Sequence, residues 1–206
     1  MKTPYVHQTD LVSQWCRANN PQNALPIFDA FTNTLNETAF GELLDLQFES
    51  TATVDMKSIE QMTQLKSGSL IAASMKIGAL SGGAPPSLVE TLNNLGWQIG
   101  VIFQMMNDIN NITGRDIQSK GLVGHDLVRQ KKNWATVALE QAGISFEELS
   151  NLPEPRLTEA LKPVVTEIDQ RISQASTYIT QLPDSMMKKL FTQLLQESKE
   201  EWFWVD

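Results

Sequence analysis

A row of polar side chains lies inside the apolar stretch 103–112. Gln104, Asn107, Asp108 and Asn111 recur at i, i+3, i+4 and i+7, so a helix would place all four on one face. The residues between them are phenylalanine, methionine and isoleucine. Burying a carboxylate and amides among such neighbours costs free energy unless each group finds a hydrogen bond or a metal ion. The row therefore predicts a polar partner.

Lysines in two other segments could bind an anion beside this row. Lys66 lies in a stretch of small residues, 65–74, where a compact ammonium group would suit a phosphate, although an interior lysine more often extends into solvent. The glycine-containing segment 114–124 is followed by a basic run that includes Lys131 and Lys132. Basic side chains next to an acidic and amide row are what a metal and anion site needs; a solvated charge run is the alternative. Asp45, on an apolar surface near Glu42, is either part of this site or of a solvated acidic edge.

Apolar residues at helical spacing predict that helices carry these side chains. The Gly- and Pro-rich segment 81–86 is a strong helix breaker, and turn-rich residues separate the other segments. The stretch 86–112 is apolar nearly all round, which is typical of the central helix of a bundle. We therefore expect an all-α fold. Its predicted helices cover 10–19, 22–48, 59–77, 86–112, 154–179 and 186–195.

Composition limits the possible partners and compartment. The chain has 206 residues, of which 41% are hydrophobic, and we expect a single domain. A net charge of −8 argues against nucleic acid as a partner. The single cysteine, Cys16, excludes an intramolecular disulfide, and we expect it to be a buried, inert thiol. With no signal-like start and no apolar run long enough to span a membrane, the expectation is a cytoplasmic protein without a transmembrane segment.

Four motifs, in this order and spacing, resemble the second half of the trans-type isoprenyl diphosphate synthases, the polyprenyl synthetase family. That family carries G-Q-x-x-D-L, then K-T-G-x-L with G-A-L, then F-Q-x-x-D-D-x-x-D, and a loop G-K-x-x-G-x-D followed by K. The matching segments here are Gly41-Glu-Leu-Leu-Asp-Leu46, Lys66-Ser-Gly-Ser-Leu70 with Gly78-Ala-Leu80, Phe103-Gln with Asn107-Asp108-x-x-Asn111, and Lys120 with Gly124-His-Asp126 and Lys131.

The resemblance implies a partial isoprenoid-synthase helical bundle, with residues 1–206 as one all-α domain that lacks the family's N-terminal helices. In the family, magnesium ions hold an allylic diphosphate, whose ionisation leaves a cation that isopentenyl diphosphate attacks. No single residue is assigned as catalytic with certainty. Carried over, the diphosphate-binding residues would be Lys66, Ser67, Lys120 and Lys131. The magnesium-facing residues would be Asp108, Asn107 and Asn111, supported by Gln104, Asp45 and Phe103.

Departures from the family pattern weaken the expected site. Asn-Asp-x-x-Asn keeps one of three carboxylates, and amide oxygens bring no charge, so magnesium should bind less tightly. Glu42 replaces a glutamine and adds a negative charge near the expected diphosphate. Lys120 lies one residue too early relative to Asp126. The family's first aspartate-rich motif precedes G-Q-x-x-D-L, yet residues 1–40 contain no paired aspartates and no arginine cluster.

Three functions stay open at this point. The chain is a component or derivative of a prenyltransferase whose partner contributes the first motif, a non-catalytic binding or regulatory subunit, or a relative of the ComQ-type prenyltransferases that modify a peptide tryptophan. Another function on this fold, such as that of a terpene cyclase, is a further alternative. A bundle without its N-terminal helices would expose apolar faces of the helices at 22–48 and 86–112, so we expect a homo- or hetero-oligomer, for example with a prenyltransferase subunit. The aromatic tail 201–206 either docks on the body or contacts a partner.

Overall fold

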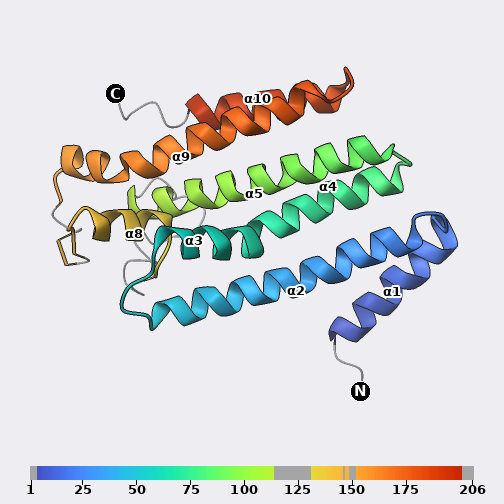
Figure 1. Ribbon diagram of the computed structural model, residues 1–206, viewed down its shortest axis with the longest axis horizontal. Coiled ribbons are helices and arrows are strands. Elements are labelled where there is room, and N and C mark those ends of the chain that lie inside the picture. The colour runs from blue at the N-terminus through green and yellow to red at the C-terminus, as the bar shows by residue number, and fades with distance from the viewer. Residues whose placement is uncertain (1–3, 114–130, 146, 149–151, 201–206) are drawn as a thin grey trace.

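The computed structural model describes residues 4–113, 131–145, 147–148 and 152–200, and these residues form helices without any strand. Lys120 and Asp126, and with them most of the fourth motif, lie outside the described residues, as does the tail 201–206. The elements, labelled as in Figure 1, are α1 (Pro4–Asn19), α2 (Ala24–Glu49), α3 (Met56–Thr63), a π-helical turn η1 (Gln64–Gly68), α4 (Ser69–Ser81), α5 (Pro86–Thr113), α8 (Trp134–Gln141), α9 (Glu154–Thr180) and α10 (Met186–Glu200).

Local sequence signals explain most of the helix boundaries. Asp55 caps α3, because its Oδ1 accepts a hydrogen bond of 2.7 Å from the backbone N–H of Ser58. Gly83 has a φ of 69°, which favours glycine, and with Pro86 it separates α4 from α5 as the breaker segment predicted. The predicted helices are confirmed, although α1 and α10 are longer than predicted. The helix over 59–77 contains the π-helical turn, and the sequence analysis did not predict α8.

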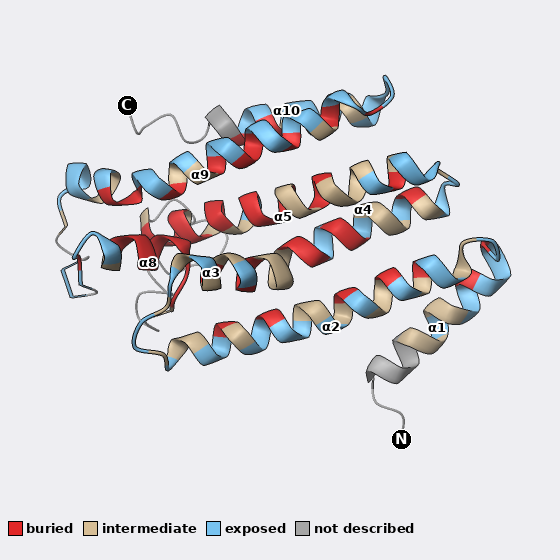
Figure 2. Ribbon diagram, viewed as in Figure 1, coloured by how far each residue is buried: buried red, intermediate tan, exposed pale blue. Residues whose placement is uncertain are grey.

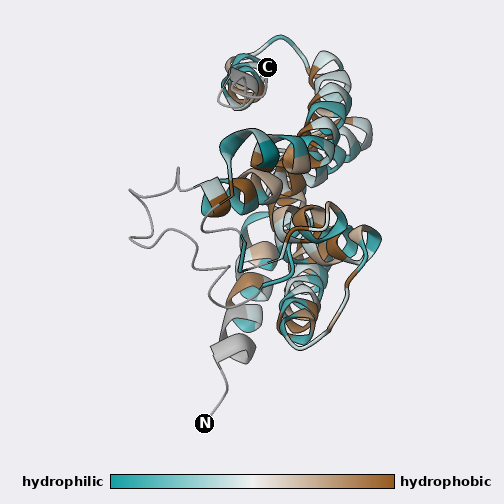
Figure 3. Cartoon of the chain, turned by 90° about the vertical axis from the view of Figure 1, so that its left-hand side faces the viewer, coloured by the Kyte–Doolittle hydropathy of each residue, from teal (hydrophilic) through white to brown (hydrophobic). Residues whose placement is uncertain are grey.

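The helices lie side by side, with α5 in the interior of the bundle (Figure 1). α4 and α9 both pack on α5, α2 packs on α4, and α10 packs on α9. Buried residues run along α5 and α8, whereas α2 is buried in short patches (Figure 2). In the view turned by 90°, hydrophobic stretches face the middle of the bundle (Figure 3). The apolar character of α5 therefore follows from its central position.

Glycines bring three helices unusually close together. A Cβ atom on Gly100 would lie 2.7 Å from the Cα of Gly68, and one on Gly96 would lie 2.6 Å from the Cα of Ala72. On the other side of η1, a Cβ atom on Gly41 would lie 2.5 Å from the backbone nitrogen of Lys66. The segment η1–α4 is thus held tightly between α2 and α5. Side chains from these three elements can meet over a short distance.

Exposed large apolar residues lie on α2 and also on α1, α4 and α10. Those of α2 are Leu25, Phe40, Leu43 and Leu46, whereas Phe103 is the one exposed large apolar residue in the described part of α5. The apolar surface that we expected to be exposed is therefore found on α2, whereas α5 exposes only Phe103 among its large apolar residues. Cys16 is buried, as predicted. Among the described residues, no helix combines the length and the apolarity that a membrane span requires.

Candidate functional site

Two lysines from distant segments converge on one buried carboxylate. The Nζ atoms of Lys66 and Lys131 lie 2.7 and 2.8 Å from the same atom, Oδ2 of Asp45, and Lys66 also lies 3.0 Å from Oε2 of Glu42. Asp45 is 6% exposed. These groups face a cavity of about 270 Å³, which we call the lysine cavity. Its lining consists of Asp45, Met62, Lys66, Gln104, Asn107, Asp108, Lys131 and Asn133.

The π-helical turn and a glycine place Lys66 in the lysine cavity. Lys66 lies in the middle of η1, and single π-helical turns inside α-helices frequently occur at functional sites. Gly41 lets the backbone of α2 approach Lys66 more closely than any side chain would permit. Asp45 follows Gly41 by one turn of α2, so the contact between the two helices also delivers the carboxylate to the ammonium group.

The start of α8 positions Lys131. Asn133 and Thr136 form a capping box, in which each backbone N–H donates to the other residue's side chain at 2.9 Å. The hydroxyl of Thr136 also donates to the carbonyl oxygen of Lys131 at 2.7 Å. Lys131 is therefore held through its backbone by α8 and through its ammonium by Asp45.

The electrostatics of the Asp45 cluster favour its charged form. Burial by itself would raise the pKa of Asp45, but hydrogen bonds from Lys131 and Lys66 outweigh it and lower the pKa below the usual value of 3.8. Burial likewise opposes the charge of Lys66, but hydrogen bonds to Asp45 and Glu42 raise its pKa above 10.5. Both groups are therefore ionised near neutral pH.

The predicted polar row of α5 adjoins the same cavity. Asp108 is buried, and both of its oxygens accept hydrogen bonds: Oδ1 from Nε2 of Gln104 at 2.8 Å and Oδ2 from the backbone N–H of Trp134 at 3.2 Å. Oε1 of Gln104 accepts from the hydroxyl of Ser67 at 2.9 Å. Asp108 thus connects α5 to the N-terminus of α8, where a negative charge is favourable.

The structure brings most of the predicted residues together. Gln104, Asn107 and Asp108 line the lysine cavity, whereas Asn111 is buried outside its lining. Phe103 is 51% exposed and does not line the cavity.

Sequence reasoning did not single out Met62, Asn133 or Trp134. Asn133 lines the cavity, and Trp134 anchors α8 through its indole N–H, which donates to Thr63 Oγ1 at 3.0 Å. The pattern Asn133-x-x-Thr136 before an apolar run is a capping signal that could have revealed α8.

The described residues of the lining balance their own charge but do not by themselves neutralise a diphosphate as well. Lys66 and Lys131 are matched by Asp45 and Asp108, and Glu42 adds a further negative charge to Lys66. The described residues contain no group of three or more histidine, cysteine, aspartate or glutamate side chains suited to a metal ion. Asp108 and Asn107 offer oxygen ligands, which fit a magnesium ion that keeps most of its ligands as water or substrate oxygens.

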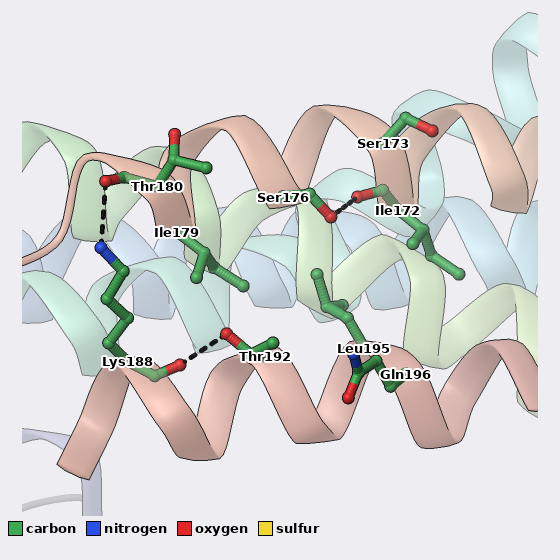
Figure 4. Close-up of a pocket in the computed structure, with 9 residues that line it drawn as sticks. All are labelled: Ile172, Ser173, Ser176, Ile179, Thr180, Lys188, Thr192, Leu195 and Gln196. Atoms are coloured by element: carbon green, nitrogen blue, oxygen red, sulfur yellow. Dashed lines mark hydrogen bonds between the residues drawn. The ribbon is translucent and has the colours of Figure 1, made fainter. Parts of the chain in front are cut away.

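A larger cavity, of about 340 Å³, lies between α9 and α10 (Figure 4). Its hydroxyls mostly donate within their own helices, as Ser176 does to the carbonyl of Ile172 at 2.8 Å and Thr192 to that of Lys188 at 2.8 Å. The ammonium of Lys188 donates to the carbonyls of Thr180 and Leu182 at the end of α9. These polar groups are therefore engaged in stabilising the two helices.

Comparison with known proteins is consistent with the motifs. The family model described as polyprenyl synthetase matches residues 6–168. The geranylgeranyl diphosphate synthase of Methanosarcina mazei is 31% identical over 129 residues, which are 63% of this chain and 40% of that protein. The (2E,6E)-farnesyl diphosphate synthase of Mycobacterium tuberculosis is 36% identical over 103 residues, which are 50% of this chain and 29% of that protein.

Among solved structures, a geranylgeranyl pyrophosphate synthetase from the archaeon Geoglobus acetivorans matches with a TM-score of 0.79 at 22% identity. The match covers 95% of this chain and 63% of that one. The matched regions span 40% or less of these two curated relatives.

Proposed function

Because the chain belongs to the polyprenyl synthetase family, we propose that the lysine cavity binds the diphosphate group of an isoprenyl diphosphate. The observation that carries this proposal is the convergence of Lys66 and Lys131 on one oxygen of Asp45. Two ammonium groups held so close together can both donate to one diphosphate. The relatives' names, which are those of prenyl diphosphate synthases, support the same ligand class.

Without a ligand, the carboxylate of Asp45 accepts the hydrogen bonds of both lysines, as a bound diphosphate would. A diphosphate that enters must share the lysine donors with Asp45, and each ammonium has three N–H donors, so a lysine can keep Asp45 and still contact the ligand. Ser67 lies beside Lys66, and its hydroxyl already donates to Gln104. We propose Lys66 and Lys131, which line the cavity, as the diphosphate ligands. Lys120, which lies outside the described residues, is a further candidate because of the family pattern.

We propose magnesium as the cation that makes this binding possible. Asp108 and Asn107 would hold it, and Asn111, one helical turn further along α5, would support them. When bound, magnesium would neutralise the charge that develops on a departing diphosphate. Asp108 is oriented for this by Gln104 and Trp134, while the amides that flank it bring no charge. The site should therefore bind magnesium weakly unless a diphosphate is present.

For activity, we propose that the chain contributes one part of a prenyltransferase site. Its 206 residues contain no pair of adjacent aspartates, so a second acidic, magnesium-binding segment would have to come from another polypeptide or from sequence beyond these residues. A non-catalytic diphosphate-binding subunit is the second candidate. The complete pairing of Lys66 and Lys131 with Asp45 favours it, because a site that is already neutralised need not turn over a substrate.

Calorimetric titration tests the binding proposal. Inorganic pyrophosphate and geranyl diphosphate should bind more tightly with magnesium than without it, and Lys66→Met and Lys131→Met should each weaken binding about tenfold. Lys57→Met removes an exposed charge at the start of α3 and should leave binding unchanged. Equal binding by all three variants would show that the diphosphate site lies elsewhere.

A transfer assay separates the two candidate functions. Labelled isopentenyl diphosphate, geranyl diphosphate and magnesium would be incubated with the chain alone and with any co-purifying protein, and a tryptophan peptide would serve as an alternative acceptor. Transfer to isopentenyl diphosphate supports the prenyltransferase. Transfer only to the tryptophan peptide supports the ComQ-type reaction. Tight binding without product in every mixture supports the non-catalytic subunit.

The oligomeric state can be tested on the same sample. We propose that the chain forms a homo- or hetero-oligomer through α2, because Leu25, Phe40, Leu43 and Leu46 are exposed along it. Light scattering should report a mass above 23.0 kDa. Leu43→Glu should then lower the measured mass, and a monodisperse monomer would contradict the proposal.

A further inference from the structure

A second cavity, of about 180 Å³, lies between α2, α4 and α5. We call it the threonine cavity, after the buried Thr34 in its wall. Alanines form its small apolar part, and polar side chains from α2, α4 and α5 surround them. The lining residues are Ala30, Asn33, Thr34, Glu37, Ser69, Ala72, Ala73, Lys76, Asn93 and Trp97.

Most polar side chains of this cavity, unlike those of the lysine cavity, have no partner among the described residues. Five side chains from three helices line it without a hydrogen bond or ion pair to any part of the chain that the structure describes: Asn33, Thr34, Glu37, Lys76 and Asn93. Only Ser69 is engaged, with its own helix and with Thr38. Asn33 is exposed, and Glu37, Lys76 and Asn93 are half-buried, so these four can also contact solvent. Thr34 is the buried one. Polar groups that converge on a cavity are a common feature of ligand sites.

Thr34 is the most informative of the five. It is 7% exposed, and its Oγ1 is buried without a hydrogen-bond partner among the described residues. A threonine in a helix can usually donate to the carbonyl four residues earlier, as Thr32 does to Phe28 at 3.0 Å. A buried hydroxyl without such a bond is costly, so its presence beside a polar cavity indicates a partner outside the described residues.

Charge and size restrict the partner. The wall carries one carboxylate, Glu37, and one ammonium, Lys76, which are not paired with each other within 4.0 Å. Two amides and a hydroxyl add donors and acceptors of both kinds. Both charges of the wall are satisfied at once by a ligand that has an ammonium and a carboxylate of its own. The volume is below that of a pocket for drug-sized ligands.

We propose that the threonine cavity is a binding site for a small zwitterion, a molecule of amino-acid size that carries one ammonium and one carboxylate group. Glu37 accepts from the ligand's ammonium, Lys76 donates to its carboxylate, and Thr34, Asn33 and Asn93 complete the hydrogen bonds. The site is separate from the lysine cavity, so its ligand does not depend on the diphosphate function proposed above.

Amide NMR spectra of the full chain test the site with defined probes. Glycine, β-alanine and 4-aminobutyrate extend the separation of the two charges one methylene at a time, and propionate and propylamine each carry only one charge. We expect shifts at Ala30, Ala72 and Ala73, with the best zwitterion binding at least tenfold more tightly than either single-charge probe. No shifts at these alanines, or equal affinity of all probes, would overturn the proposal.

Variants locate the binding. Glu37→Gln and Lys76→Met should each lower affinity for the best zwitterion about tenfold, and Thr34→Val, which keeps the shape of the side chain, should lower it several-fold. Glu147→Gln and Lys57→Met remove exposed charges elsewhere and should change nothing. Lys66→Met should also leave zwitterion binding intact while it weakens pyrophosphate binding. Loss of both ligands in Lys66→Met would mean that the two cavities form one site, and would contradict a separate zwitterion site.

Discussion

The lysine cavity and the threonine cavity differ in how many of their polar side chains have partners among the described residues. In the lysine cavity, Lys66, Lys131 and Asp45 satisfy one another, and Gln104 links Ser67 to Asp108. In the threonine cavity, the polar side chains other than Ser69 have no partners among the described residues, and Thr34 is the buried one. One cavity is thus satisfied without a ligand, and the other contains a buried hydroxyl that is not.

The difference predicts opposite responses to mutation. Removing a polar group from a paired network leaves its partners exposed to an apolar environment, which destabilises the fold. Removing a polar group that has no partner relieves a cost that the fold already bears. Stability measurements on matched variants in the two cavities therefore test the comparison directly, and binding measurements show which ligand each cavity takes.

The largest effect is expected for Asp45→Ala. Without the carboxylate, two lysine ammonium groups remain close together with Glu42 as the nearest remaining carboxylate, and the free energy of unfolding should fall by about 3 kcal/mol. Denaturant unfolding measures this change. Asp29→Asn, on the exposed side of α2, is the matched control and should stay within about 0.5 kcal/mol of the parent. If Asp45→Ala unfolds like the control, the cluster is not a stabilising network.

The same cluster predicts how stability depends on pH. Because the pKa of Asp45 is lowered in the folded state, its contribution is present above the usual carboxyl value of 3.8 and is lost as pH falls through the lower, folded value. The parent should therefore lose more stability than Asp45→Asn as the solution is acidified below pH 3.8. Parallel acid-unfolding curves for the two proteins would show that Asp45 is not the group that titrates.

A glycine exchange tests the packing that brings the cluster together. Gly41→Ala would place a Cβ atom 2.5 Å from the backbone nitrogen of Lys66, so α2 must move away from η1, at a cost of about 1–3 kcal/mol. Gly78→Ala is the matched control, since a Cβ atom there meets nothing within 4 Å and should stabilise α4 by about 0.5–1 kcal/mol. The Gly41 variant should also lose pyrophosphate affinity, because Lys66 moves with η1. Unchanged stability and affinity in Gly41→Ala would mean that the close approach is not required.

Two threonines one helical turn apart give the sharpest contrast between unpaired and paired groups. Thr34→Val removes a buried hydroxyl that has no partner and should raise the free energy of unfolding by about 1 kcal/mol. Thr38→Val breaks the 3.1 Å hydrogen bond between Thr38 and Ser69 and should lower it by a similar amount. Thermal unfolding of both variants without added ligand measures the pair. A loss of stability in both would show that the hydroxyl of Thr34 has a partner in solution.

The fold and the location of the lysine cavity could be predicted from sequence more fully than its contacts. Helical spacing and the breaker at 81–86 placed the long helices, and family motifs placed Lys66, Asp45 and Asp108 near one another. Motifs do not reveal that Asp45 pairs with both lysines, because that contact joins residues 21 and 86 positions apart. The π-helical turn depends on close packing around Gly41 and Gly100, which periodicity does not report. No motif predicted the threonine cavity, since most of its residues become neighbours only through tertiary packing.

The smallest effect is expected for Glu42→Gln, which introduces the residue of the family pattern. The side chain of Glu42 is 52% exposed, so its 3.0 Å ion pair with Lys66 should add less than about 1 kcal/mol to stability. Its charge nevertheless repels an incoming diphosphate, and its removal should raise pyrophosphate affinity about two- to fivefold at low salt and less at high salt. Glu147→Gln is the control for a change in net charge alone. A pyrophosphate affinity that stays constant in Glu42→Gln would mean that Glu42 does not oppose diphosphate binding. Asp45 would then be the single carboxylate that competes with the diphosphate for Lys66.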